Sequence, residues 1–440
     1  MAREAPASAV EATNGAATAA PSTQHVVYID WLKFLVVYGI VVYHACMPFV
    51  YGGGWLVGSH DKSLVLTAFA GFTFPWGIPL LFLLSGAGAY FGLRSKTAEA
   101  FLRKRVTRLG LPLLAGIVLL SPMQAYLSSG IVPKNIGGMV DYYPRFLSSV
   151  QFEWTPQWLG RYGYHLWFLG YLLVITAATL PLLEWIRGRS GLRRVARLAV
   201  LSRHRGGIIV FAVPLALTQV LLRSRFPGYQ DWADVATYTV VFLAGYVLAA
   251  VRTFAVAIRR NARLMLALGI GSSLAVGAML VTSAGNPELG SPAAIFYNAT
   301  YSLFWSLNIW SWCMAVMAMG IIWLEKSNAV VRYGAESALP VYIIHHPVLV
   351  VLGSFIVMWN LPLWPRFLLL LAIGMAATIA IYEFGIRRHR VTRFIFGLPP
   401  APPRVEGRNQ DRPRTPLARP GMRSGELASN QRKSAGQSTR

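Results

Sequence analysis

The feature that most constrains the fold is a series of long apolar runs. A hydrocarbon core of about 30 Å needs roughly 20 mostly apolar residues per helix, and runs of that length recur through most of the chain. Hydrophobic residues make up 55% of the 440 residues and charged residues only 13%. This composition argues against a set of soluble domains and predicts an all-α, polytopic membrane helix bundle with about ten transmembrane helices.

The limits of the expected helices follow from the runs themselves. They are 31–50, 66–92, 109–128, 165–186, 207–222, 235–251, 264–283, 295–324, 339–358 and 366–386. The run at 207–222 is short and is the least secure of the ten.

Basic residues test this series because cytoplasmic connections are enriched in Lys and Arg. They cluster around 94–108, 187–205, 252–263 and 325–336, which are alternate connections, and the opposite connections carry fewer. The pattern predicts a multi-pass protein of the inner (plasma) membrane with both termini in the cytoplasm. It also explains the net charge of +24, and since no nucleic-acid-binding motif accompanies that charge, we expect no nucleic-acid partner.

Three parts of the chain differ in composition. Residues 1–27 are rich in Ala, Ser and Thr and lack the apolar core of a signal peptide, so we expect a disordered cytoplasmic arm. Residues 28–397 are expected to form one transmembrane domain. Residues 398–440 are rich in Pro, Arg, Ser and Gln, which predicts a disordered basic cytoplasmic tail.

The first run contains a set of ionisable residues. Such a side chain costs about 2.5–3.5 kcal/mol on insertion scales, so it needs a partner or a purpose. The segment YIDWLKFLVVYGIVVYHACMPF carries Asp30, Lys33 and His44. At about 100° and 1.5 Å per residue, Lys33 and His44 lie within roughly 20° on one face and about 16 Å apart. A snorkelling lysine and a histidine hydrogen-bonded within the bundle explain this pair as well as a functional stripe does.

Two further motifs lie at the end of the second run and at the beginning of the third. LFLLSGAGAYFGLR places Ser85 among glycines that allow close helix packing or passage of a narrow ligand. AFLRKRVTRLGLP presents Arg105 and Arg108 on one helical face, which suits bidentate contacts with the phosphates of CoA. Anchoring at the cytoplasmic face explains such basic clusters more often.

Polar residues also occur in the later runs. His165 and Trp167 open the run at 165–186 on the outer side, in YHLWFLGYLL. His345 and His346, in LPVYIIHHPVLVV, point about 100° apart on a regular helix and cannot readily share one metal, so we expect no metal site. Glu383 lies near the inner end of the last run and is expected to pair with a basic side chain.

Together these segments resemble the acyltransferase 3 family of integral membrane acyltransferases. Within it they are most similar to the glucan biosynthesis protein C branch, associated with succinylation of osmoregulated periplasmic glucans. The resemblance covers nearly the whole membrane region. It rests on YIDWLK followed by His44, LFLLSG, RKRVTRLGLP, HLWFLGYLL, and VYIIHHPVLVVLGSF followed by IYEFG, all in family order. It favours a functional role for His44. Arg105 and Arg108 match the family's pair, but the family has an Arg where this chain has Lys33, which keeps the charge and loses the planar fork.

The resemblance implies an O-acyltransferase that moves a succinyl or acetyl group from cytoplasmic acyl-CoA to a hydroxyl of a periplasmic glucan or other glycan. Acyl-CoA is then a co-substrate, and no permanently bound cofactor is expected. The candidate catalytic residues are His44 and Asp30; the candidate acyl-CoA-binding residues are Lys33, Arg105 and Arg108; the candidate acceptor or cavity residues are His165, Trp167, Ser85, His345 and Glu383. His44 would act either as a general base or as a transient acyl carrier.

Two rival functions use the same residues. A glycan or lipid transporter would use the buried charges as a pathway and would move its substrate without consuming acyl-CoA. An inactive acyltransferase-like scaffold, for which Lys33 is the only hint, would bind CoA poorly or not at all. The lack of an internal repeat and the ordered family segments favour the enzyme over the transporter.

Overall fold

The regular structure of this protein is helical throughout the part that can be described. The computed structural model describes residues 26–128, 136–282 and 291–400, and every regular element in these ranges is a helix. The expected all-α class is therefore confirmed. Apart from a few residues next to the helices, the predicted arm and tail lie outside the described residues.

Eight helices in the described residues are long and apolar enough to cross a membrane, and each corresponds to one expected run. They are α1 (Val27–Cys46), α2 (Leu64–Arg94), α8 (Trp167–Arg187), α11 (Trp232–Ala250), α13 (Ala262–Thr282), α14 (Pro292–Trp323), α15 (Ala329–Ile356) and α16 (Leu363–Ala380).

Two expected spans differ from the others. The run at 109–128 is part of a longer broken helix that bends by 41° and adds a ninth span if its two parts are counted together. The run at 207–222 is apolar but too short to be counted as a span. The first comprises α3 (Ala98–Arg105), the π-helical turn η2 (Val106–Gly110), α4 (Leu111–Leu119) and α5 (Ser121–Ser128); the second comprises η4 (Gly207–Ala212) and α10 (Val213–Leu222).

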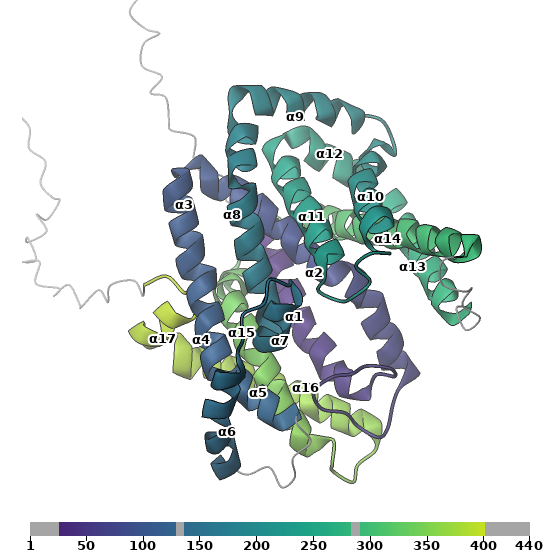
Figure 1. Cartoon of the computed structure of the whole chain (residues 1–440). Coiled ribbons are helices and arrows are strands. Elements are labelled where there is room, and N and C mark those ends of the chain that lie inside the picture. Colours follow the sequence, from purple (N-terminus) through teal and green to yellow (C-terminus); the bar gives the residue numbers. More distant parts are fainter. Residues whose placement is uncertain (1–25, 129–135, 283–290, 401–440) are drawn as a thin grey trace, which may run out of the picture. The chain divides into compact units, whose positions relative to one another are not determined.

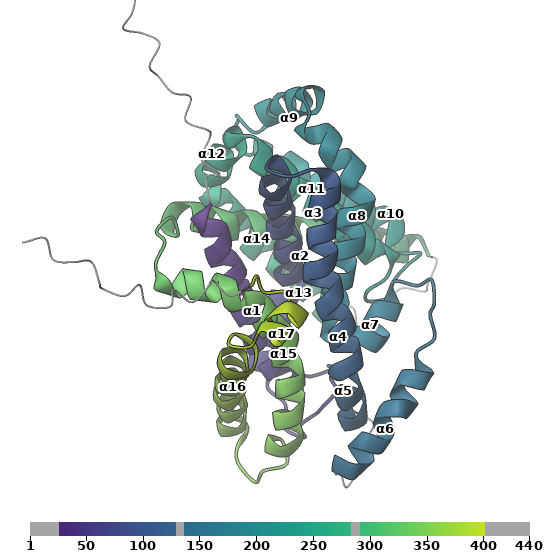
Figure 2. The ribbon, with the colours of Figure 1, turned by 90° about the vertical axis from the view of Figure 1, so that its left-hand side faces the viewer.

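Two connections that the sequence marks as basic loops are helices, α9 (Arg189–Leu201) and α12 (Arg252–Arg260). On α9, Val195 and Ala199 are buried and the neighbouring arginines are exposed, a pattern typical of helices that lie in the membrane interface. Both lie side by side at one end of the bundle (Figures 1 and 2). The other short helices are α6 (Ile136–Ser149), α7 (Gln157–Gly163) and α17 (Arg390–Ile395), with the 3₁₀ turns η1 (Met47–Phe49) and η3 (Tyr164–Leu166) and the π-helical turn η6 (Ile381–Ile386).

Helix α1 is an inner helix of the bundle. It packs against α2, α14, α15 and α16 (Figures 1 and 2). Helix α2 is fixed in turn against α11 by small residues, as the sequence predicts. A Cβ atom at Gly86 would lie 1.9 Å from the carbonyl oxygen of Phe242, and one at Gly245 would lie 1.9 Å from that of Leu83. The ionisable residues of α1 are thus held among other helices and not on a lipid-facing surface.

Polar side chains mark where several helices begin. The side chains of Ser63, Ser291 and Asn328 each accept a hydrogen bond from a backbone N–H in the first turn of α2, α14 and α15. Such caps satisfy donors that have no partner within the helix.

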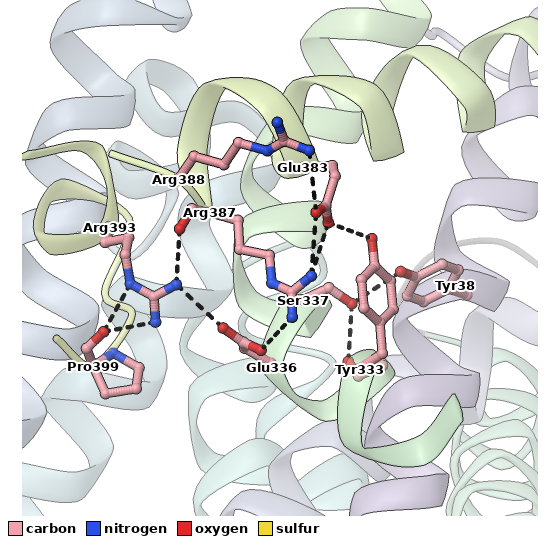
Figure 3. Close-up of polar contacts among 10 residues, drawn as sticks. Tyr38, Tyr333, Glu336, Ser337, Glu383, Arg387, Arg388, Arg393 and Pro399 are labelled. Atoms are coloured by element: carbon pink, nitrogen blue, oxygen red, sulfur yellow. Dashed lines mark hydrogen bonds and ion pairs between the residues drawn. The ribbon is translucent and has the colours of Figure 1, made fainter. Parts of the chain in front are cut away.

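An ion-pair network ties the end of α16 to α15 and α17 (Figure 3). Glu336 on α15 accepts from Arg393 at 3.3 Å and lies 3.5 Å from Arg387. Glu383, in the π-helical turn η6, contacts Arg387 at 3.1 Å and accepts a hydrogen bond from the Tyr333 hydroxyl. The Arg393 side chain is only 6% exposed, so Glu336 neutralises a buried charge.

Replacing this carboxylate is expected to weaken the fold. In Glu336→Gln the buried Arg393 guanidinium loses a charged partner, and we expect the free energy of unfolding to fall by about 1.5–3 kcal/mol, the net value of a hydrogen bond to a charged group. The thermal midpoint of the purified protein in detergent measures this.

The matched control is Glu99→Gln, which removes the i,i+4 pair of Glu99 with Arg103. Both side chains of that pair are more than 70% exposed, so the midpoint should not change measurably. Equal midpoints for the two variants would contradict a stabilising role of Glu336.

Candidate active site

Two cavities within the helix bundle are lined in part by residues of α1. The histidine cavity, of about 590 Å³, is lined mainly by apolar side chains of α1, α2 and α14, together with His44, His165, Trp76 and Trp167. The cationic cavity, of about 350 Å³, lies between α1, α2, α8, α15 and the α3–α4 segment. Tyr342 lines both cavities, so its side chain lies between them.

Four histidines from three separate segments gather at the histidine cavity. The ring of His44 on α1 lies 5.1 Å from that of His345 and 4.7 Å from that of His346, measured between centroids. The ring of His165 stacks on that of His346 at 4.6 Å. The sequence predicts functional roles for His44, His165 and His345. In the fold, His346 lies beside His44 and His165.

The hydrogen bonds of His345 fix which nitrogen of His44 carries a proton. Nδ1 of His345 lies 3.0 Å from the carbonyl oxygen of Val341, which can only accept, so this nitrogen carries the hydrogen. In a neutral ring Nε2 of His345 is then an acceptor. Since it lies 3.0 Å from Nδ1 of His44, His44 donates from Nδ1. Its Nε2 keeps a free lone pair, as a base or a nucleophile requires.

His346 is held in one neutral tautomer by two partners. The indole N–H of Trp55 donates to its Nε2 at 3.2 Å, and its Nδ1 donates to the amide oxygen of Gln124 at 2.6 Å. Gln124 is completely buried, which favours a role in orienting the ring of His346. Both nitrogens of His346 are therefore occupied, which leaves it a structural role beside His44.

A proline explains how His165 is positioned. Pro347 has no N–H, so the carbonyl oxygen of Ile343 one turn earlier lacks its usual helical donor. Nε2 of His165 lies 3.0 Å from that oxygen and donates to it. The backbone carbonyl of His165 accepts a hydrogen bond from the Tyr342 hydroxyl. This arrangement leaves Nδ1 of His165 buried without a partner among the described residues, as is the indole N–H of Trp76.

His44 and His345 are hydrogen-bonded to each other, and His165 and His346 are hydrogen-bonded to neighbouring groups. Among the described residues, no group of three or more His, Cys, Asp or Glu side chains could hold a metal ion. The arrangement suits proton transfer by a single imidazole at the cavity wall.

The cationic cavity contains the residues expected to bind acyl-CoA. Its basic lining residues are Lys33, Lys96, Lys104, Arg105 and Arg108, and Asp30 and Ser85 also line it. Arg108 lies in η2, a π-helical turn of the kind that is frequent at functional sites. A group of positive side chains in one concave site favours a ligand with several negative charges, such as a polyphosphate.

Glycine makes room for Lys33 in this cavity. A Cβ atom at Gly88 would lie 3.1 Å from Nζ of Lys33, so a larger residue would crowd the ammonium group. Close by, a terminal nitrogen of Arg105 lies 3.5 Å from the backbone carbonyl of Ser85. The glycine-rich segment of α2 thus serves both helix packing and space for a cation.

The structure divides the predicted site residues between different places. His44, His165 and Trp167 line the histidine cavity, and His345 lies behind His44, 3.0 Å from its Nδ1. Asp30, expected to be catalytic, and Ser85, expected at the acceptor, line the cationic cavity instead, together with Lys33, Arg105 and Arg108. Glu383 lines neither cavity and belongs to the ion-pair network of Figure 3. The sequence predicts this pairing with a basic side chain, but the position of Glu383 differs from its expected place among the acceptor or cavity residues.

Sequence reasoning missed Gln124, Trp55 and Tyr342. Gln124 offered a signal, because an amide side chain inside an apolar run needs a partner. Trp55 lies outside the apolar runs and Tyr342 is one of many tyrosines, so neither was distinguishable by sequence pattern.

Comparison with known proteins agrees with the motifs. The chain matches the acyltransferase 3 family, described as an acyltransferase domain, over residues 26–383. Similar proteins include the Glucans biosynthesis protein C of Salmonella paratyphi A (strain ATCC 9150 / SARB42), Salmonella agona (strain SL483) and Salmonella dublin. Each is 24% identical over 351 residues, which cover 79% of this chain and 88% of the relative. No solved structure matches the chain. Because the family match spans well over half of its length, this protein belongs to the acyltransferase 3 family of membrane acyltransferases.

Proposed function

We propose that this protein is a membrane O-acyltransferase that moves an acyl group from acyl-CoA to a hydroxyl of a glucan. The observation that carries the proposal is the hydrogen-bonded series from Val341 through His345 to His44, which leaves Nε2 of His44 unprotonated at a cavity wall. Tyr342 lines both the histidine cavity and the cationic cavity. The glucan acceptor is suggested by the names of the similar proteins.

The donor would bind with its phosphates in the cationic cavity. Lys33, Arg105 and Arg108 supply the positive charge, and the guanidinium groups suit bidentate contacts with phosphate oxygens. The pantetheine arm would then reach past Tyr342, so that the thioester lies in the histidine cavity next to His44. In this proposal the donor would bind from the cytoplasmic side, and the protein would reside in the inner membrane of the cell envelope.

The transfer step uses His44 as a general base. Nε2 of His44 takes the proton of a sugar hydroxyl while the hydroxyl oxygen forms a bond to the thioester carbonyl carbon. The tetrahedral intermediate then expels the sulfur of CoA, which receives the proton from His44. An ester and free CoA leave, and His44 is neutral again.

His345 acts as a positioning residue in this mechanism. Replacing it tests whether the orientation of the His44 imidazole matters for catalysis. In His345→Ala the imidazole of His44 loses its acceptor and its fixed orientation, so kcat should fall about 100-fold, the cost of a misplaced catalytic group. The KM for acyl-CoA should stay unchanged. In His345→Gln the amide oxygen can accept from His44, and much of the activity should return. Steady-state kinetics of CoA release measures both variants.

A merely structural role for His345 would lower the thermal midpoint of both variants and reduce the amount of active protein without rescue by glutamine. His60→Ala is the control, because His60 is an exposed loop histidine that lines neither cavity. Equal activity of the alanine and glutamine variants at position 345 would contradict the hydrogen-bonded series.

The proposed function is tested by acceptor-dependent release of CoA. The purified protein in nanodiscs receives succinyl-CoA or acetyl-CoA, the two donors that the resemblance implies, with and without a glucan. We expect thiol release that depends on the glucan for at least one donor. Release that is absent for both donors, in folded protein that binds no CoA, would exclude acyl transfer from these donors and favour a transporter.

A further inference from the structure

A third cavity, of about 250 Å³, lies beside the histidine cavity and has no part in the mechanism above. It lies between α2, α10, α11, α14 and the segment 223–231, which connects α10 to α11. Phe74 and Tyr229 line both this cavity and the histidine cavity, so the two meet at these side chains. A group bound in the third cavity is therefore next to the space in which His44 acts.

One side of the third cavity is aromatic. The rings of Tyr301 and Trp305 on α14 stack with centroids 5.6 Å apart and planes inclined by 26°. Phe74 lies 6.2 Å from Trp305 and 5.5 Å from Tyr229, again between centroids. The C–H faces of a sugar ring pack on such surfaces, and tyrosine adds a hydroxyl that can hydrogen-bond at the edge.

The other side of the cavity is polar and pre-ordered. Arg223 forms an ion pair with Asp234, and its Nε and Nη1 donate to Gln219 and to the carbonyl of Gly228, both at 3.1 Å. Each terminal nitrogen of the guanidinium carries a further N–H, and each carboxylate oxygen accepts more than one hydrogen bond. This pair can thus donate to and accept from hydroxyl groups without leaving its own partners.

The charge of this wall selects against ionised ligands. The side chains of Arg223 and Asp234 are 25% and 12% exposed and neutralise each other, so the cavity offers an anion no net positive charge. This is the opposite of the cationic cavity, where basic side chains predominate. An uncharged ligand with many hydroxyls satisfies the third cavity better than a phosphate or a uronic acid does.

The backbone is strained at Gln230, next to Tyr229, which lines both cavities. Gln230 has a φ of 60°, a left-handed conformation that is uncommon for residues other than glycine. Its N–H donates to Asp234 at 2.8 Å, and its carbonyl accepts from the Tyr171 hydroxyl at 2.7 Å. The neighbouring Tyr229 is therefore fixed where the cavities meet, and backbone strain of this kind clusters at functional sites.

We propose that the third cavity is the subsite for an uncharged glycosyl unit of the acceptor, stacked on Tyr301 and Trp305 and hydrogen-bonded to Arg223 and Asp234. This inference rests on the proposed function and adds the place from which the acceptor approaches His44. The bound unit presents the chain's next hydroxyls toward Phe74 and Tyr229, at the entrance to the histidine cavity.

The test measures binding and turnover separately. Binding of neutral gluco-oligosaccharides to the full chain in nanodiscs, without acyl-CoA, is followed by isothermal titration calorimetry. We expect Trp305→Ala to weaken binding at least tenfold and to raise the KM for the oligosaccharide by the same factor. The KM for acyl-CoA should not change. Oligomers of glucuronic acid should bind at least tenfold more weakly than the neutral oligomers.

Two further variants keep the test decisive. Arg223→Lys retains the charge beside Asp234 but loses the planar fork, so it should also weaken binding. It tests the subsite independently if Trp305→Ala does not fold. Phe296→Ala is the matched control, because Phe296 lies on the same helix, is 74% exposed and does not line the cavity. Oligosaccharide affinities within twofold of the unaltered protein in both Trp305→Ala and Arg223→Lys would overturn the subsite.

Failure of the subsite and failure of the proposed function give different results. Acyl transfer that continues with an unchanged oligosaccharide KM in these variants overturns the subsite alone. Oligosaccharide binding that depends on Trp305, in a protein that releases no CoA from any donor, supports the subsite and overturns acyl transfer.

Discussion

Replacing His44 by alanine is expected to reduce the kcat of acyl transfer by about 100- to 10,000-fold, the range that a general base contributes. The reason is that His44 presents an unprotonated nitrogen at the wall of the histidine cavity, and its tautomer is set by the hydrogen-bonded series from His44 through His345 to Val341. The KM for acyl-CoA should change little, since the phosphates bind in the other cavity. Initial rates of CoA release at saturating glucan give both constants.

The outcome for His44 is interpretable only if the variant folds. Its thermal midpoint should stay close to that of the unaltered protein, and His60→Ala should retain full activity. A His44→Ala protein that folds, binds acyl-CoA and keeps more than a tenth of the kcat would contradict the role of His44. Label from the acyl group that remains on the protein after quenching would indicate the transient acyl carrier instead of the general base.

Replacing Arg105 by alanine is expected to raise the KM for acyl-CoA by about 10- to 100-fold, since a lost hydrogen bond to a charged group is worth about 1.5–3 kcal/mol. The kcat should fall much less, because this interaction is the same in the ground state and the transition state. Titration of initial rates against acyl-CoA at fixed glucan measures the change.

Arg103 supplies the matched control for this prediction. It lies on the same helix as Arg105, its side chain is 75% exposed, and it pairs with Glu99 without lining the cationic cavity. Arg103→Ala should leave the KM unchanged. If Arg105 contacts the 3′-phosphate of CoA, the Arg105→Ala substitution should have a smaller effect on the KM of a donor that lacks this phosphate. Equal KM values for the two arginine variants would contradict phosphate binding at the cationic cavity.

Much of the fold was predictable because lipid imposes a simple rule on length and polarity. A span needs enough apolar residues to cross the hydrocarbon core, and that requirement alone located the eight long helices. The same rule failed where the chain is bent or short. The 41° break between α4 and α5, and the division of 207–222 into a 3₁₀ turn and a short helix, depend on packing that hydropathy does not report.

The candidate site was predictable in part. Periodicity correctly set Lys33 and His44 on one unbroken helix, but it did not reveal that they line different cavities. The contact between His44 and His345 joins residues 301 positions apart, and no local pattern encodes such a pairing. The position of His165 depends on Pro347, which frees a backbone carbonyl for a side chain from another segment. These relations follow from how helices pack, and a single sequence does not contain that information directly.

The measurement that tests the central claim most directly is the stoichiometry of the reaction. The purified protein in nanodiscs receives isotopically labelled acyl-CoA and a neutral gluco-oligosaccharide, and mass spectrometry counts ester groups while a thiol assay counts free CoA. The account predicts one oligosaccharide ester for each CoA released, and neither product with His44→Ala. Unmodified oligosaccharide and intact acyl-CoA, together with transport of the oligosaccharide by the same protein in sealed liposomes, would contradict it.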